Sequence, residues 1–380
     1  MNKAENTWAA RLTPPGKSAV ATIALFGPDA GQVARELFRR RNGKTLPDDP
    51  PAGTFYLGQF GGELADQVVL AVKEPGMNSL EIHCHGGPEV VDLILEQLAD
   101  RGVRCCSWQD FLQRTSPSKL QSLASMELAK ASTLRTADLL LDQYHGAFER
   151  AVVEVLTRIE RGDTDEAKRR LDELNQFGKL GSRLTQPWRI AILGPVNAGK
   201  SSLVNALVGF QRSIVASAPG TTRDILAATI AIDGWPVELL DTAGWREQPG
   251  ELEKEGIEQA KEIAANADLI IWLVEAGAEP VWPPQTMASL LVINKIDLPP
   301  VWDVDAVDAL KISAKTKAGL EELCALLAKK LVPTIPTAGT AIPFTSFLAE
   351  AIEQACDRAS QGDWDAVRQT LDRIACAEVG

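Results

Sequence analysis

The chain has 380 residues and a formal net charge of −12 at neutral pH, which argues against a protein that coats nucleic acid non-specifically. That length allows about two or three domains. It contains no apolar run of about 18 residues and no signal-peptide core at its start, so no membrane association is expected. Its six cysteines form no Cys-x-x-Cys pair, which favours free thiols in a reducing cytoplasm.

Residues 1–117 carry a mixed pattern of short strands and helices. Apolar alternation predicts strands at Ala19–Phe26 and Gln67–Val72, and a strand ending in a glycine turn at Leu80–Pro88. Helical spacing predicts helices at Asp29–Arg40 and Glu89–Arg101, the second ended by a glycine. We therefore predict an α+β domain over residues 1–117.

Three local features of this region carry possible chemistry. The basic run Arg39–Lys44 is either an RNA contact or, as the bland alternative, a solvated helix end. His83 and His85 share one face of a strand, but no third ligand is evident, so we predict no zinc site. The adjacent Cys105 and Cys106 are expected to be buried packing residues rather than a redox pair.

After residue 117 the sequence pattern is first helical, then alternates between strand and helix, and is then helical again. Apolar residues recur at helical spacing from Lys119 to about Arg183, and again after the Pro-rich stretch Pro333–Pro343. Between them, residues 187–332 alternate strand and helix, which is typical of an α/β domain with a mainly parallel sheet. We predict that this domain is inserted into a discontinuous helical domain, residues 118–186 and 338–380. Prolines within Glu279–Ser289 predict that the crossover helix expected there is degenerate.

The α/β segment opens on a phosphate-binding signature. An apolar run from Trp188 leads into Gly194-Pro-Val-Asn-Ala-Gly-Lys-Ser201, the Gly-x4-Gly-Lys-Ser pattern of a P-loop. Its backbone amides and the following helix N-terminus would bind phosphate. Lys200 would span the β- and γ-phosphates, and the Ser201 hydroxyl would hold Mg²⁺. The predicted contacts here are Asn197, Ala198, Gly199, Lys200, Ser201 and Ser202.

Four further signals follow in the order that a GTPase requires. In chain order they are the Thr221-Thr222 pair, the Asp241-x-x-Gly244 turn, the Asn294-Lys295-x-Asp297 motif and the loop Ser313-Ala314-Lys315. The threonines and the Asp-x-x-Gly turn suit the γ-phosphate and its Mg²⁺. An aspartate after a buried strand can accept from both N–H donors of guanine, which adenine lacks. The sequence therefore predicts GTP and GDP binding.

The hydrolysis machinery departs from Ras-type enzymes, which place a water-orienting Gln directly after Asp-x-x-Gly. Here that position holds Trp245, so another device must supply the missing stabilisation. At this point the chain resembles the tRNA-modification GTPase family MnmE (TrmE). The resemblance rests on Thr13-Pro-Pro-Gly16, Glu81-Ile-His-Cys-His-Gly-Gly87, Lys119-Leu120, the P-loop, Gly220-Thr-Thr-Arg-Asp224 and Asp241-Thr-Ala-Gly-Trp-Arg-Glu247.

The resemblance implies a specific set of roles. A K⁺ ion at the phosphates would be held by Asn197 and by a loop matching Ala216, Ala218 and Thr221, with Ala216 and Thr221 also near the nucleotide. Mg²⁺ would be held by Ser201 and Thr222. Glu253 would orient the attacking water, which makes Glu253, Lys200 and Asn197 the expected catalytic residues. The family further implies a homodimer that acts on tRNA with a flavin-dependent partner.

The resemblance also implies a tetrahydrofolate derivative bound by the N-terminal domain, with Glu81 and Lys119 as contacts. Two features depart from the family: its strand arginine falls on Ala24, and this sequence ends without the Cys-bearing tail. GTP binding is expected to survive these departures. Two alternatives therefore stay open: a diverged paralogue acting as a regulatory or assembly GTPase without folate chemistry, and a structural dimerisation module with vestigial nucleotide binding.

Overall fold

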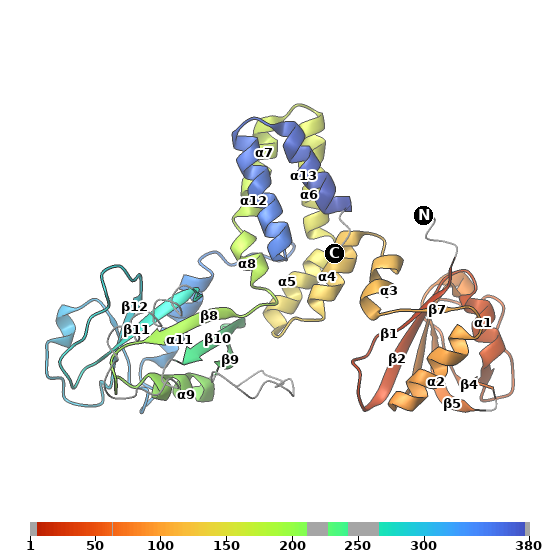
Figure 1. Cartoon of the computed structure of the whole chain (residues 1–380), viewed down its shortest axis with the longest axis horizontal. Helices are drawn as coiled ribbons and strands as arrows, with labels where there is room; N and C mark the ends of the chain where they lie inside the picture. The colour runs from red at the N-terminus through yellow and green to blue at the C-terminus, as the bar shows by residue number, and fades with distance from the viewer. Residues whose placement is uncertain (1–5, 63, 211–226, 242–265, 377–380) are drawn as a thin grey trace, which may run out of the picture. The chain divides into compact units, whose positions relative to one another are not determined.

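The computed structural model describes residues 6–62, 64–210, 227–241 and 266–376. It divides into two compact units, Met1–Ser122 and Leu123–Gly380 (Figure 1). Within the ranges described, no helix is both long enough and apolar enough to cross a membrane.

The first unit is a seven-stranded sheet with helices on both faces. Its strands are β1 (Trp8–Arg11), β2 (Ser18–Phe26), β3 (Phe38–Arg40), β4 (Phe55–Gly61), β5 (Ala65–Val72), β6 (Ser79–Gly86) and β7 (Arg104–Cys105), in the spatial order β3-β4-β5-β6-β2-β1-β7. Helices α1 (Ala30–Leu37) and α2 (Pro88–Ala99) share one core with the sheet, while α3 (Trp108–Thr115) packs through Phe111 on a second, smaller cluster. The turn η1 (Pro75–Met77) precedes β6.

Side-chain alternation along β6 decides which groups remain accessible. Leu80, Ile82 and Cys84 are buried in the core that α1 and α2 cover. Glu81 and His83 point to the opposite face and are only partly covered. Burial raises the pKa of the Cys84 thiol to about 11, so this thiol stays protonated near neutral pH.

The helix predicted at Asp29–Arg40 is too long by three residues. The structure ends α1 at Leu37 and continues as the edge strand β3, which pairs antiparallel with β4. The Phe38 ring is fully buried beside Gly58, where an added Cβ would lie 2.6 Å from it. The basic run therefore begins in an edge strand and not at a helix end.

The prediction for the vicinal cysteines is wrong for Cys105. Its side chain is exposed at the edge of the sheet, whereas Cys106 is partly buried against the cluster around Phe111. The reason is that β7 is a two-residue strand at the edge of the sheet, which pairs with β1, and among the described residues no further strand pairs with its outer side.

One group of helices in the second unit comes from the two ends of that unit's sequence. These helices are α4 (Lys119–Leu128, which starts in the first unit), α5 (Leu134–Tyr144), α6 (Ala147–Glu160), α7 (Thr164–Asn175), α8 (Gly178–Ser182), α12 (Ser346–Ser360) and α13 (Trp364–Cys376). Helix α12 packs against α7, α8 and α13, and α13 packs against α6 (Figure 1).

Two close contacts fix the returning chain to these helices. Buried Gln143 donates to the carbonyl of Thr340 at 3.0 Å and accepts from the amide of Ile342 at 3.1 Å. Gly181 in α8 approaches the same segment so closely that a Cβ there would lie 2.1 Å from the carbonyl oxygen of Pro343. The backbone of the returning segment is therefore held at two helices, by the Gln143 side chain of α5 and by close packing against Gly181 of α8.

The α/β part of the second unit is a six-stranded sheet. Its strands are β8 (Trp188–Leu193), β9 (Ala227–Ile232), β10 (Trp235–Asp241), β11 (Leu269–Glu275), β12 (Leu290–Asn294) and β13 (Leu310–Lys311), in the order β13-β12-β11-β8-β10-β9. All neighbouring pairs are parallel except β9 with β10. Within the described residues, the helical elements of this part are α9 (Lys200–Phe210), α11 (Leu320–Leu331) and the turn η3 (Val304–Ala306).

The connection from β11 to β12 lacks its crossover helix, as its prolines predict. Residues 276–289 form turns and irregular chain. Met287 and Trp272 pack there on a small cluster with Leu193, and the Trp272 indole donates to the carbonyl of Val281 at 2.8 Å. The loop thus supplies part of the cover that a helix would give this face of the sheet.

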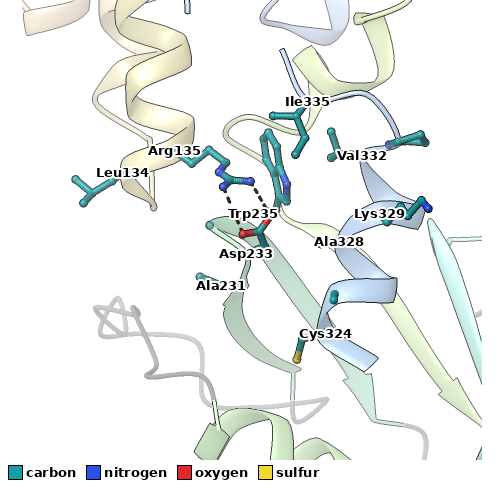
Figure 2. A pocket seen from close by; sticks show the side chains of 13 residues that line it. Leu134, Arg135, Ala231, Asp233, Trp235, Cys324, Ala328, Lys329, Val332 and Ile335 are labelled. Atoms are coloured by element: carbon teal, nitrogen blue, oxygen red, sulfur yellow. Dashed lines mark hydrogen bonds and ion pairs between the residues drawn. The ribbon is translucent and has the colours of Figure 1, made fainter. Parts of the chain in front are cut away.

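The hairpin between β9 and β10 is fastened to helix α5 (Figure 2). Its turn residues Asp233 and Gly234 both have positive φ, at 48° and 77°, as in the two-residue turns that join twisted strands. Arg135 donates to both carboxylate oxygens of Asp233, at 2.8 and 3.4 Å, and its guanidinium lies 5.2 Å from the Trp235 ring centre. A cavity of about 930 Å³ beside this contact is also lined by α11 and by Ile335.

Candidate nucleotide-binding site

The predicted nucleotide residues gather at one edge of the six-stranded sheet. The P-loop joins β8 to α9, Asn294 is the last residue of β12, and the loop from Ile312 follows β13. Because β8, β11, β12 and β13 run parallel, their carboxyl ends share this edge, which is where open α/β sheets bind ligands.

Close backbone packing explains the glycines of the P-loop. Gly194 has a φ of 141°, and a Cβ there would lie 2.3 Å from the carbonyl oxygen of Leu273 in β11. Gly199 has a φ of 93°, and a Cβ there would lie 2.4 Å from the side-chain amide nitrogen of Asn294. Asn197 also has a left-handed backbone, with a φ of 67°, at the exposed part of the loop. The loop is therefore held tightly at both ends.

The P-loop lysine is held against the loop itself. Lys200 opens helix α9, and its ammonium group donates to the carbonyls of Gly194 and Pro195, each at 3.0 Å. Ser201 and Ser202 follow in the first turn of the helix, one partly and one fully exposed. The positive charge and the helix N-terminus thus lie together where an anion would bind.

Asn294 connects the P-loop to the loop after β13. Its side-chain amide donates to the carbonyl of Ala198 at 2.9 Å, and its side-chain oxygen accepts from the amide of Ala314 at 3.0 Å. Asn294 is only 1% exposed, and its bond to Ala198 is buried while its bond to Ala314 is partly buried. One buried side chain therefore sets the distance between the phosphate loop and the predicted guanine loop.

The carboxylate of Asp297 is oriented by Ser313. The Ser313 hydroxyl donates to it at 2.6 Å and accepts from the amide of Thr316 at 3.0 Å. This hydrogen bond, helped by Lys315 and Lys295, lowers the pKa of the Asp297 carboxyl below its usual value. The exposed Asp297 is thus an ionised acceptor, as recognition of the guanine N–H donors requires.

The other predicted nucleotide-binding, cation-binding and catalytic residues lie outside the described ranges. These are Ala216, Ala218, Thr221, Thr222, Gly244 and Glu253. Trp245, which stands where Ras-type enzymes have glutamine, lies outside them as well. For Asp241 the backbone is described, as the end of β10 beside Ile192.

Sequence comparison connects this geometry to known proteins. The family model of the "GTP-binding protein TrmE N-terminus" matches residues 7–116, and that of the "50S ribosome-binding GTPase" matches residues 189–301. A tRNA modification GTPase MnmE from Thermus thermophilus is 34% identical, over 82% of this chain and 79% of that protein. The protein of the same name from Chlamydia felis is 33% identical, over 84% and 79% respectively.

The chain belongs to the MnmE family. As a family member with a GTPase domain, it is a GTP-hydrolysing enzyme.

The predicted folate contacts of this MnmE-family chain have unequal surroundings. Glu81 forms an ion pair with Lys73 at 3.2 Å and lies 3.6 Å from the imidazole of His83. Lys119 is partly buried at the start of α4. Ala24, where the family arginine would fall, is 5% exposed and packs in the cluster with Phe111, so this position offers no charge.

The strand histidines form polar pairs instead of a metal site. His83 hydrogen-bonds to the Thr22 hydroxyl at 3.0 Å, and His85 pairs with Asp66 at 2.7 Å. In the part of the chain that the structure describes, no group of three metal-ligating side chains occurs.

Sequence reasoning missed Glu275, which pairs with a residue of the predicted nucleotide site. It ends β11 and pairs with Lys295 of the guanine motif at 2.8 Å. The sequence shows an acidic residue at the end of an apolar strand, and this feature alone does not identify the residue with which it pairs.

Proposed function

We propose that this enzyme hydrolyses GTP with Mg²⁺ and K⁺ at the edge of the six-stranded sheet. The observation that carries the proposal is the Asn294 bridge, because it joins a phosphate loop to an oriented carboxylate suited to guanine. The exposed backbone of Asn197 and the serine at the start of α9 offer the oxygen ligands that such cations prefer. When bound, the two cations supply charge neutralisation at the phosphates.

In this proposal the residues of the chain bind the phosphates, hold the two cations and orient the attacking water. The P-loop amides and Lys200 hold the β- and γ-phosphates, with Ser201 and Thr222 as Mg²⁺ ligands. Asn197 and oxygens of Ala216, Ala218 and Thr221 hold K⁺. Glu253 orients a water for in-line attack on the γ-phosphorus, and the bond to the β–γ bridging oxygen breaks, leaving GDP and phosphate.

Dependence on K⁺ tests the hydrolysis proposal. We expect turnover of the full chain to be at least about tenfold faster in KCl than in NaCl at equal ionic strength, because in this proposal a bound K⁺ supplies part of the charge stabilisation at the phosphates. Asn197→Ala should lose this difference and still bind GDP. Phosphate release is the measurement, with Lys200→Ala as the inactive control. Equal rates in the two salts would refute the K⁺ mechanism.

We further propose that GTP hydrolysis serves tRNA modification, the role for which the relatives are named, and that the modified base is a wobble uridine. In this scheme residues 1–117 bind a folate and mediate a homodimer, and a flavin-dependent partner supplies the remaining chemistry. Residues 118–186 and 338–380 form one discontinuous helical domain around the GTPase domain 187–332. Dimerisation of the GTPase domains would drive the cycle.

Folate binding distinguishes the tRNA-modification role from the alternative role as a regulatory or assembly GTPase. We expect 5-formyl-tetrahydrofolate to give a saturable heat in titration calorimetry, which Glu81→Ala abolishes and Glu96→Ala, an exposed substitution on α2, leaves unchanged. The rival is a paralogue that acts as a regulatory or assembly GTPase. It is favoured by the buried, uncharged Ala24, and an absence of heat would support it.

A further inference from the structure

The lysine of the guanine motif lies alongside the P-loop. Lys295 follows β12 with a left-handed backbone, φ 63°, which turns its side chain back towards the phosphate loop. A Cβ added at Gly199 would lie 4.0 Å from Lys295 Cε. The aliphatic stem of Lys295 is therefore in contact range of the loop that carries the phosphates.

The charged end of this lysine is fixed by a residue outside all nucleotide motifs. Lys295 Nζ lies 2.8 Å from Glu275 Oε2, with the two side chains 29% and 18% exposed. Glu275 is the last residue of β11 and stands directly opposite Asn294 in the sheet. The ion pair thus bridges the ends of two adjacent parallel strands beneath the proposed guanine site.

Glu275 is itself held in place by its backbone. Its carbonyl accepts from the indole of Trp302 at 3.0 Å, and the next amide, Ala276, donates to the carbonyl of Asn294 at 3.0 Å. Trp302 in turn packs edge-to-face on Trp282, with ring centres 5.5 Å apart. These contacts hold the backbone of Glu275 in place, and the ion pair with Lys295 is what holds its carboxylate.

We propose that Glu275 is a positioning residue for guanine-nucleotide binding. It holds the ammonium group of Lys295, so that the flexible stem of this lysine stays along the P-loop and forms one wall of the base pocket. A free lysine side chain samples many rotamers, and ordering it on binding costs affinity. Because Glu275 already orders the lysine side chain in the nucleotide-free protein, nucleotide binding does not have to restrict it further. The inference rests on the proposed assignment of Asn294–Asp297 as the guanine site.

The test is the release rate of a fluorescent GDP analogue from the full chain. Glu275→Gln keeps the shape and removes the charge, and we expect release about tenfold faster, between the effects of exposed and buried ion pairs. The matched control is Glu238→Gln, which breaks a 3.0 Å pair with Arg189 elsewhere in the same sheet and should leave release unchanged.

A double-mutant cycle separates positioning from general stability. Lys295→Met should also speed release, and adding Glu275→Gln to it should have no further effect. The proposal would be overturned if the two substitutions increased the release rate independently, so that the double variant showed the product of the two increases. It would also be overturned if Glu275→Gln released the analogue at the wild-type rate. Thermal melting of each variant without nucleotide identifies any loss caused by unfolding alone.

A separate variant distinguishes this failure from failure of the site assignment. Asp297→Asn should shift preference from GTP to XTP, because xanthine presents a carbonyl where guanine presents an amine. No shift would refute the guanine assignment and the positioning role together. A shift combined with normal release from Glu275→Gln would refute the positioning role alone.

Discussion

Replacing Asn294 by alanine is expected to weaken GDP and GTP binding by about 100-fold. The side chain makes two hydrogen bonds, a buried one to the P-loop at Ala198 and a partly buried one to the loop at Ala314. Its removal leaves a buried carbonyl and a partly buried amide without this partner, at about 1–3 kcal/mol each. A total near 3 kcal/mol corresponds to about 100-fold in affinity, because the two loops would no longer be held at the spacing of one nucleotide.

Equilibrium titration of the fluorescent GDP analogue measures this loss. Asn205→Ala is the control, since Asn205 is an exposed residue of α9 in the same domain and should bind GDP like the wild type. Melting temperatures with and without GDP complete the measurement: Asn294→Ala should lose most of the nucleotide-induced stabilisation. Affinity within about threefold of wild type would show that the bridge does not set the loop spacing.

The second large effect is expected at Gly181, in stability rather than binding. A Cβ at this position would lie 2.1 Å from the carbonyl oxygen and 2.7 Å from the carbonyl carbon of Pro343. Backbone atoms cannot move aside as a side chain can, so Gly181→Ala must separate α8 from the returning chain. We expect a loss of about 3 kcal/mol and an apparent melting temperature lower by about 6–12 °C.

The control lies three residues earlier in the same helix. A Cβ at Gly178 would make an ordinary 3.6 Å contact with the Ala349 side chain, and alanine favours the helix. Gly178→Ala should therefore melt at or slightly above the wild-type temperature in differential scanning fluorimetry. Equal melting of the two variants would contradict the close approach of Gly181 to Pro343.

The sequence predicts those elements whose evidence is local. The strand at 18–26 and the helices after Phe344 show their periodicity within one window, and the P-loop carries its function in adjacent residues. The end of α1 is different, because Phe38 fits a helical pattern but pairs with Phe60, 22 positions later, in β4. Cross-strand pairing overrides local preference there.

Contacts between distant residues account for the parts of the site that could not be predicted. Glu275 and Lys295 are brought together by strand register alone, since β11 sets Glu275 opposite Asn294. Arg135 and Asp233, which are 98 positions apart, are also joined at long range, here by the packing of helix α5 on the β9–β10 turn. Glu275 belongs to no recognisable pattern, and the Asp-Gly turn pattern of Asp233 does not name a partner.

The fastening of the β9–β10 hairpin has a mechanical consequence. In the chain, the hairpin stands between Thr222 on one side and Glu253 on the other, the two segments proposed to contact the γ-phosphate and its water. A strand of six residues is about 20 Å long, so the turn at Asp233 is a strand's length away from Asp241. On its other side the hairpin is held by the pairing of β10 with β8. Any shift of the turn at Asp233 must therefore either move helix α5 through Arg135 or break that ion pair.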